Sequence, residues 1–114
     1  VCSYGTHSHQ IAAAVSMIKE KFREPISVAD IAGNIGLSEP SLHRHFKNMT
    51  GFSPIKYQKI LRLYEGRNIL RSGRKTVSGA AFEVGYASSS QFTNDYRKFF
   101  GLSPRYDARA GFAA

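Results

Sequence analysis

The sequence contains one cysteine and only eight acidic residues among its 114 residues. The single Cys2 excludes an intramolecular disulfide framework, so we expect a protein of a reducing compartment such as the cytoplasm. No apolar run approaches the ~18 residues needed to cross a bilayer, and no signal-peptide pattern is present. Stretches that alternate apolar and polar residues, the pattern of β-strands, are also scarce. These absences point to a small helical protein without a membrane partner.

Motifs for catalysis and for cofactors are absent as well. Ser, His and Asp occur without a pattern that would activate a nucleophile, and no glycine-rich phosphate loop appears. His7 and His9 lie near the N-terminus, while His43 and His45 are two residues apart on a predicted helix and point in different directions. No cysteine or carboxylate cluster completes a metal site. We therefore expect neither an enzyme nor a cofactor or metal, and His45 is expected to fill a partly buried gap.

Positive charge is abundant and unevenly placed. Sixteen Lys and Arg residues give a net charge of +8 and an isoelectric point near 9.9. Residues 41 to 75 hold nine of the basic residues against one acidic residue. These nine are Arg44, Lys47, Lys56, Lys59, Arg62, Arg67, Arg71, Arg74 and Lys75. A concentrated basic region favours a polyanionic partner, although charge alone does not separate DNA from RNA or an anionic membrane.

Helical periodicity recurs along the chain. In "SHQIAAAVSMIKEKFRE" the apolar residues fall on one helical face, and Pro25 then ends the helix. Residues 54 to 71 predict one longer helix, whose apolar side carries Ile60, Leu63, Tyr64 and Leu70. Gly66 near its centre costs about 1 kcal/mol relative to Ala, which suggests a close contact at its backbone.

Two segments share one layout, "SVADIAGNIGLSEPSLHRHFKNMTG" and "TVSGAAFEVGYASSSQFTNDYRKFFG". Each predicts a capped short helix, a glycine-containing turn and a second helix that ends at Gly, which together form a helix-turn-helix. Equivalent residues are 49 apart before the turn and 50 apart after it, which places one extra residue in the second turn. The inward stripes of the two second helices are expected to be Leu42, Phe46, Met49 and Phe92, Tyr96, Phe99.

The second helix of each unit, termed here the recognition helix, has the size and position to enter a DNA major groove. Arg44 is suited to guanine and Asn94 to adenine. We expect base contacts from Pro40, Ser41, His43, Arg44, Ser89, Ser90, Thr93 and Asn94. We expect phosphate contacts from Ser27, Lys47, Thr76, Arg97 and Lys98.

A joining helix of about 18 residues would be ~27 Å long. Successive major-groove faces on one side of B-DNA lie ~34 Å apart. One chain could therefore place two recognition helices near that spacing, on an asymmetric site because the helices differ.

Over roughly residues 11 to 106 the chain resembles the DNA-binding domain of the AraC/XylS family of bacterial transcription regulators. The resemblance lies in "LSEPSLHRHFK", "GFSP", "GYASSSQF" and "FGLSP", with their order and spacing. It implies an all-α fold of seven helices, with two helix-turn-helix subdomains joined by a long linking helix. The boundaries expected are residues 1 to 10 as linker or cloning remnant, 11 to 53 and 72 to 114 as the subdomains, and 54 to 71 as the linking helix.

The resemblance further implies double-stranded DNA and RNA polymerase as partners, a monomeric domain, and a separate sensor domain that dimerises the whole regulator. The chain departs from the family at several positions. Asn94 stands where Arg is frequent, Gln91 where Tyr is frequent, and Gly66 where Ala is usual. Tyr106 lies one place before the family's tail tyrosine.

Two alternatives stay open at this point. The basic residues of the linking helix, Lys56, Lys59, Arg62 and Arg67, either contact DNA or form a solvated face. The chain could also be a basic helical module that binds RNA or a protein, although most of its aromatics occupy inward helical positions. Activation and repression are both compatible with the sequence.

Overall fold

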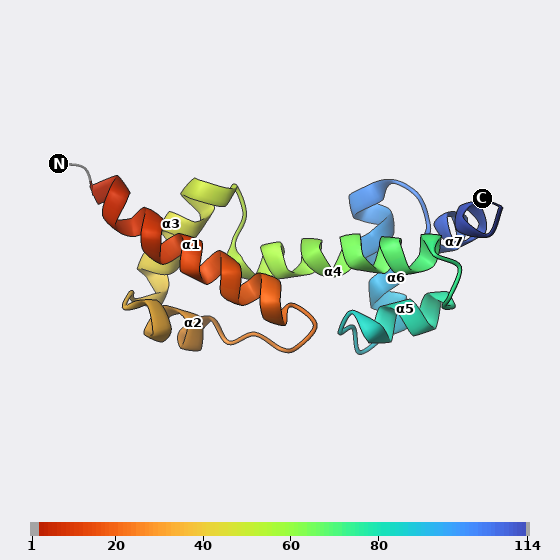
Figure 1. The fold of residues 1–114 in the computed structure, drawn as a ribbon, viewed down its shortest axis with the longest axis horizontal. Helices are drawn as coiled ribbons and strands as arrows, with labels where there is room; N and C mark the ends of the chain where they lie inside the picture. The colour runs from red at the N-terminus through yellow and green to blue at the C-terminus, as the bar shows by residue number, and fades with distance from the viewer. Residues whose placement is uncertain (1–2, 114) are drawn as a thin grey trace. The chain divides into compact units, whose positions relative to one another are not determined.

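The computed structural model describes residues 3–113, and side chains over residues 7–108. Within this range the protein is all-α, with seven helices and no strand (Figure 1). The helices are α1 (Ser3–Lys21), α2 (Val28–Ile35), α3 (Glu39–Thr50), α4 (Pro54–Arg71), α5 (Val77–Glu83), α6 (Ser89–Phe100) and α7 (Pro104–Ala113). None of the helices in the described range is both long and apolar enough to cross a membrane. Cys2 lies outside the described residues.

The chain divides into two compact units, one up to Lys59 and one from Ile60 onward. The division falls inside α4, so the linking helix contributes its first turns to the first unit and the rest to the second. The helix α1 begins at Ser3, five residues before the segment in which periodicity predicted a helix. Within α1, the Gln10 amide donates to the carbonyl oxygen of Ile35 at 2.8 Å.

In the first unit, α1 packs against both α2 and α3. Its core consists of apolar side chains that are wholly or almost wholly buried, namely Ile11, Ala14, Ile18, Ile31, Ala32, Leu42 and Phe46. The side chain of Gln58 closes the end of α1, since its Nε2 donates to the carbonyl oxygens of Phe22 at 3.2 Å and Glu24 at 2.8 Å. These bonds tie the turn that follows α1 to α4.

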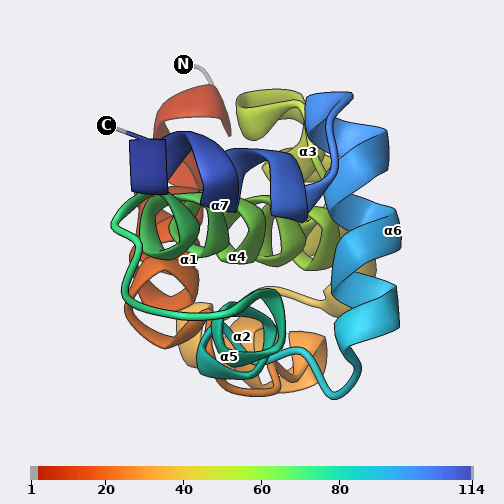
Figure 2. The ribbon, with the colours of Figure 1, turned by 90° about the vertical axis from the view of Figure 1, so that its right-hand side faces the viewer.

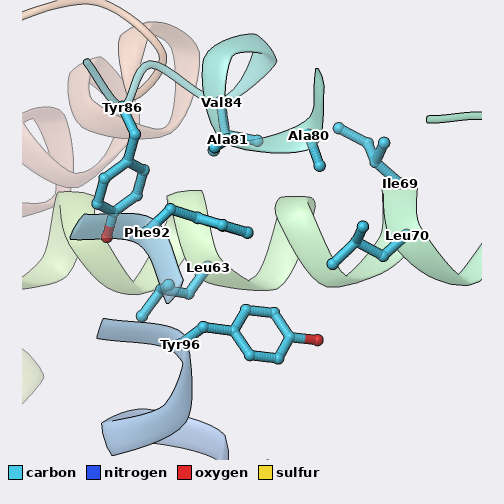
Figure 3. Packing of buried hydrophobic residues seen from close by; sticks show 9 residues of the cluster. All are labelled: Leu63, Ile69, Leu70, Ala80, Ala81, Val84, Tyr86, Phe92 and Tyr96. Atoms are coloured by element: carbon cyan, nitrogen blue, oxygen red, sulfur yellow. The ribbon is translucent and has the colours of Figure 1, made fainter. Parts of the chain in front are cut away.

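The second unit has its core where α4, α5 and α6 meet. Figure 2 shows α6 running beside the end of α4, from α5 on one side to α7 on the other. Side chains from these helices and from the turn before α6 interlock in Figure 3. They are Leu63, Ile69, Leu70, Ala80, Ala81, Val84, Tyr86, Phe92 and Tyr96.

Gly66 of α4 lies directly against the Phe92 side chain of α6. A Cβ atom added to Gly66 would stand 2.7 Å from Cε1 and 2.8 Å from Cζ of Phe92. Real carbon atoms do not approach so closely, and the Phe92 ring is wholly buried. The close contact suggested by a glycine inside a helix is confirmed, and the neighbour is the Phe92 ring.

The last helix, α7, is anchored by a carboxylate. Asp107 is only 3% exposed and accepts hydrogen bonds from the Tyr96 hydroxyl and from the Arg71 guanidinium, whose Nη2 lies 3.1 Å from Oδ1. Burial raises the pKa of Tyr96, and the hydrogen bond to Asp107 raises it further, so Tyr96 stays a donor. Tyr106 is 59% exposed. Asp107, at the place of the family's tail tyrosine, therefore holds α7 in position.

Three expected core residues are exposed instead. Met49, Tyr64 and Phe99 have 45%, 43% and 36% of their surface accessible. Met49 and Phe99 lie in the last turns of α3 and α6, where periodicity predicts the direction of a side chain but not the presence of a neighbour. The ring of Phe100, next to Phe99, packs against the second core in its place.

Candidate nucleic-acid interface

The recognition helix α3 is fixed at both ends by local interactions. The Ser38 hydroxyl oxygen accepts a hydrogen bond from the backbone N–H of Ser41, and Pro40 occupies the first turn, where its missing N–H costs nothing. Gly51 ends the helix at φ +85°, a left-handed conformation that favours glycine. With Leu42 and Phe46 buried, the opposite face of the helix turns outward. The sequence therefore determines which face of α3 is available.

The outward face of α3 carries the predicted contact residues. Pro40, His43, Arg44 and Lys47 are exposed, and Ser41 is partly exposed. The structure shows no hydrogen bond or ion pair from the side chains of Arg44 and Lys47 to other described residues. The guanidinium of Arg44 is therefore available for a bidentate bond to guanine, and Lys47 for a phosphate.

His45 belongs to the protein interior side of α3. It is half-buried, as expected, and its ring stacks on His7 of α1 with centroids 3.9 Å apart. Burial lowers the pKa of His45, and the nearby positive charges of His7 and Arg44 lower it further. Among the residues that the structure describes, no group of three or more His, Cys, Asp or Glu could hold a metal ion.

The recognition helix α6 repeats the layout of α3 with different outward residues. Ser88 caps it by accepting from the backbone N–H of Gln91, and Gly101 ends it at φ +79°. Exposed on its surface are Ser90, Asn94, Arg97 and Lys98, while Ser89 and Thr93 are partly buried. Hydroxyl and amide groups thus occupy the positions expected to face bases, and the cations follow in the last turn.

Buried within α6 is a carboxylate that periodicity did not assign. Asp95 is 9% exposed and accepts from the Tyr86 hydroxyl and the Gln91 amide, both at 3.0 Å. Burial raises the pKa of Tyr86, and the hydrogen bond to Asp95 raises it further. The signal available in the sequence was an acidic residue directly beside the inward Tyr96.

The short helices α2 and α5 present capped N-termini. Ser27 and Thr76 accept from the backbone N–H groups of Asp30 and Gly79, both at 3.1 Å. Both caps are exposed, and no acceptor for their hydroxyl hydrogens is seen among residues 7–108, so each hydroxyl can donate to a phosphate. They therefore occupy positions compatible with the expected phosphate contacts.

Several basic side chains on and after α4 contact other side chains of the protein. Arg62 lies over the Tyr86 ring at 5.9 Å, and Arg67 lies over the Tyr64 and Phe100 rings at 5.0 and 4.4 Å. The Nε atom of Arg67 is buried without a hydrogen-bond acceptor among the described residues. Packing against rings is thus the observed role of Arg62 and Arg67, which the sequence left open.

Two further cations of the basic region form ion pairs. Arg71 pairs with Asp107 at 3.1 Å, and Lys75 pairs with Glu83 at 3.2 Å. The basic residues at positions 41 to 75 therefore do not form one uniform surface for a polyanion. Arg44 and Lys47 on α3 are exposed cations and are therefore the stronger candidates for contact with a nucleic acid.

A pair of capped helix-turn-helix units with polar, partly cationic recognition faces defines a DNA-binding domain. Residues 31–109 match the family model described as "Helix-turn-helix domain". The chain belongs to the AraC/XylS family of transcription regulators and corresponds to the DNA-binding domain of that family.

Individual relatives agree with this assignment. The HTH-type transcriptional activator RhaS of Escherichia fergusonii is 37% identical over 91 residues, which cover 80% of this chain and 33% of the relative. The chain thus spans about a third of the length of the curated relatives it matches. A solved AraC-type DNA-binding regulator from Chromobacterium violaceum is 31% identical, with a TM-score of 0.84 over 94% of this chain and 96% of that one.

The DNA-binding domain of AdpA, solved in complex with a target DNA, is 23% identical to this chain. Its TM-score is 0.82 over 90% of this chain and 93% of that one. At this identity the likeness shows the fold alone.

Proposed function

We propose that this domain binds an asymmetric double-stranded DNA site in a promoter, with α3 and α6 each in a major groove. The observation that carries the proposal is the contrast between the two outward faces. Both helices have a serine cap, a buried apolar stripe and a terminal glycine, yet α3 offers Arg44 and Lys47 where α6 offers hydroxyls and Asn94. Equal scaffolds with unequal faces suit a site whose two halves differ in sequence.

Base readout is assigned to the residues whose exposure and helix position support it. On α3 and α6 these are Pro40, Ser41, His43, Arg44, Ser89, Ser90, Thr93 and Asn94. Phosphate contacts are assigned to Ser27, Lys47, Thr76, Arg97 and Lys98, which are exposed cations or helix caps. The 18 residues of α4, ~27 Å in helical length, support engagement of adjacent grooves by one chain.

The proposal extends to the whole regulator. Relatives about three times as long support a further domain that senses a signal and dimerises, while this domain binds as a monomer. The name of the RhaS relatives supports transcription activation. RNA polymerase as a partner and a cytoplasmic location belong to the same proposal. The domain would act by binding alone, without catalysis.

Selection of binding sequences from a random duplex pool tests the proposal. We expect two short, dissimilar boxes about one helical turn apart. Absence of enrichment would favour the RNA or protein-binding alternative.

Variants then assign the boxes to the two recognition helices. Arg44→Ala should weaken binding in a gel-shift series by ~1–3 kcal/mol and relax preference at one base pair. Arg44→Lys is the matched control, since it keeps the charge but loses the bidentate geometry, and should restore affinity more than preference. Asn94→Ala should relax a base pair in the other box. Site choice that survives both alanine changes but is abolished by Lys56→Ala would contradict the two-helix model.

A further inference from the structure

The exposed side chain of Gln91 is tied to a buried carboxylate at the edge of the α6 recognition face. Gln91 lies one turn before Asn94 and Asp95, so it shares a side of the helix with both. Its Nε2 donates to Oδ1 of Asp95 at 3.0 Å, while the Tyr86 hydroxyl donates to Oδ2 of the same carboxylate at 3.0 Å. Gln91 thus connects the outward surface of α6 with an acid that is 9% exposed.

The chemistry of this contact fixes the orientation of the Gln91 amide. An ionised carboxylate accepts hydrogen bonds and donates none, so the NH2 branch of the amide must face Asp95. Tyr86 supplies a second donor, and burial holds its pKa above the usual range, so Asp95 is met by donors from two directions. Within the described part of the chain, no donor to Oε1 of Gln91 is seen. The oxygen is therefore the branch that Gln91 offers to a ligand on its exposed side.

A glutamine held in this way has an altered base preference. A free glutamine can present donor and acceptor together and read adenine through N6 and N7. A glutamine whose NH2 branch is turned toward the protein meets a base with its oxygen, which can accept from the exocyclic amino group of adenine or cytosine. It also opposes the acceptor edges of guanine and thymine, because two acceptors then face each other without a proton.

We propose that Asp95 is a positioning residue that holds the Gln91 amide with its oxygen outward, which makes Gln91 select an amino-bearing base, A or C, over G or T at one position. This inference rests on the proposed function, since it requires α6 to lie in a major groove. It adds Gln91 to the base-reading residues and gives Asp95 a role in specificity that acts through Gln91.

The test compares base-preference profiles from the same duplex selection. The variants are Asp95→Asn, Gln91→Met and their double mutant, with Asp107→Asn as the matched control. The amide introduced by Asp95→Asn can donate as well as accept, which allows the Gln91 amide to turn over. We expect the preference for A or C at one position to fall about 3- to 10-fold in Asp95→Asn, the value of one hydrogen bond.

The other variants separate specificity from charge and from folding. Gln91→Met keeps the length of an exposed side chain, removes its polar atoms and should lose the same preference, while the Tyr86 hydroxyl still donates to Asp95. The double mutant should match Gln91→Met alone. Asp107→Asn removes an equal charge from a carboxylate that also bonds a tyrosine, in the same unit, and should leave the profile unchanged.

Several outcomes would overturn the inference. An unchanged profile in Gln91→Met would show that Gln91 reads no base, even if Asp95→Asn failed to fold. An equal change on Asp95→Asn with and without Gln91 would show that Asp95 acts through the shape of α6. If the wild-type domain selected boxes but their profile ignored both residues, this inference alone would fall. If the wild type selected no duplex, the proposed function would fall with it.

Discussion

Replacement of Gly66 by alanine tests the packing between α4 and α6, because two effects of opposite sign compete. Alanine in a helix interior is favoured over glycine by about 1 kcal/mol. The new Cβ would stand 2.7 Å from Cε1 of Phe92, whose ring is wholly buried and lies between the rings of Tyr86 and Tyr96 at 5.3 and 5.5 Å. Overpacking of a core costs about 1–3 kcal/mol. We therefore expect Gly66→Ala to lower the free energy of unfolding by about 1 kcal/mol.

A double-mutant cycle with Phe92→Leu separates the two effects. Leucine lacks the two ring atoms that the Cβ would meet, so in this background Gly66→Ala should stabilise by about 1 kcal/mol. Gly33→Ala is the control, since nothing lies within 4 Å of a Cβ at Gly33 in α2, and it should stabilise by up to about 1 kcal/mol. Urea unfolding followed by circular dichroism measures all of them. Stabilisation by Gly66→Ala in the wild-type background would refute the reasoning.

Three further predictions concern α7, the buried tyrosines and a helix cap. Asp107→Ala should destabilise by about 2–4 kcal/mol in the same urea assay, because it leaves the Tyr96 hydroxyl buried without an acceptor, and its cost should shrink in a Tyr96→Phe background. An equal cost in both backgrounds would contradict that coupling. The raised pKa values of Tyr86 and Tyr96 favour the folded state below pH ~10, the usual tyrosine pKa. As the pH rises above that value the stabilisation should be lost, by up to ~1.4 kcal/mol per pH unit for each tyrosine. In Tyr86→Phe, the urea midpoint should therefore fall less steeply with pH between pH 9 and 11 than in the wild type. Ser38→Ala should cost about 1 kcal/mol through the lost cap of α3, and Ser38→Asp should restore most of it; no recovery would argue against capping.

Much of the local structure could be predicted from the sequence because it depends on short-range interactions. The caps at Ser27, Ser38 and Thr76 each bond a backbone N–H three residues ahead, so their effect is contained in a few consecutive residues. The bounds of α4 follow from Pro54 and from the break after Arg71 in the same way. The helix α1 starts five residues earlier than the segment that predicted it. Its contacts with the other helices, from His7 to His45 and from Gln10 to Ile35, join residues distant in sequence, so local patterns do not reveal them.

The candidate interface likewise has some features that the sequence predicts and others that depend on tertiary contacts. Exposure of Arg44 and Asn94 follows from helical periodicity, since each stands opposite a buried stripe. The contacts of the α4 side chains Arg62 and Arg67 could not be predicted, because these side chains lie over aromatic rings that other segments contribute. Asp95 was missed for a related reason. An acid beside an inward tyrosine is expected to turn toward solvent unless a donor such as Tyr86 is known to face it.

The sequence by itself determined the repeated turn, the two capped recognition helices and the difference between their outward faces, because each depends on residues within one or two helical turns. Only the tertiary structure decided which basic side chains are available to a ligand and which pack on aromatic rings or form ion pairs within the protein. It also decided that Asp107 anchors α7 and that Gly66 admits the Phe92 ring. These outcomes depend on residues from different helices, and a hydrogen bond or a steric contact exists only once folding has brought both partners together.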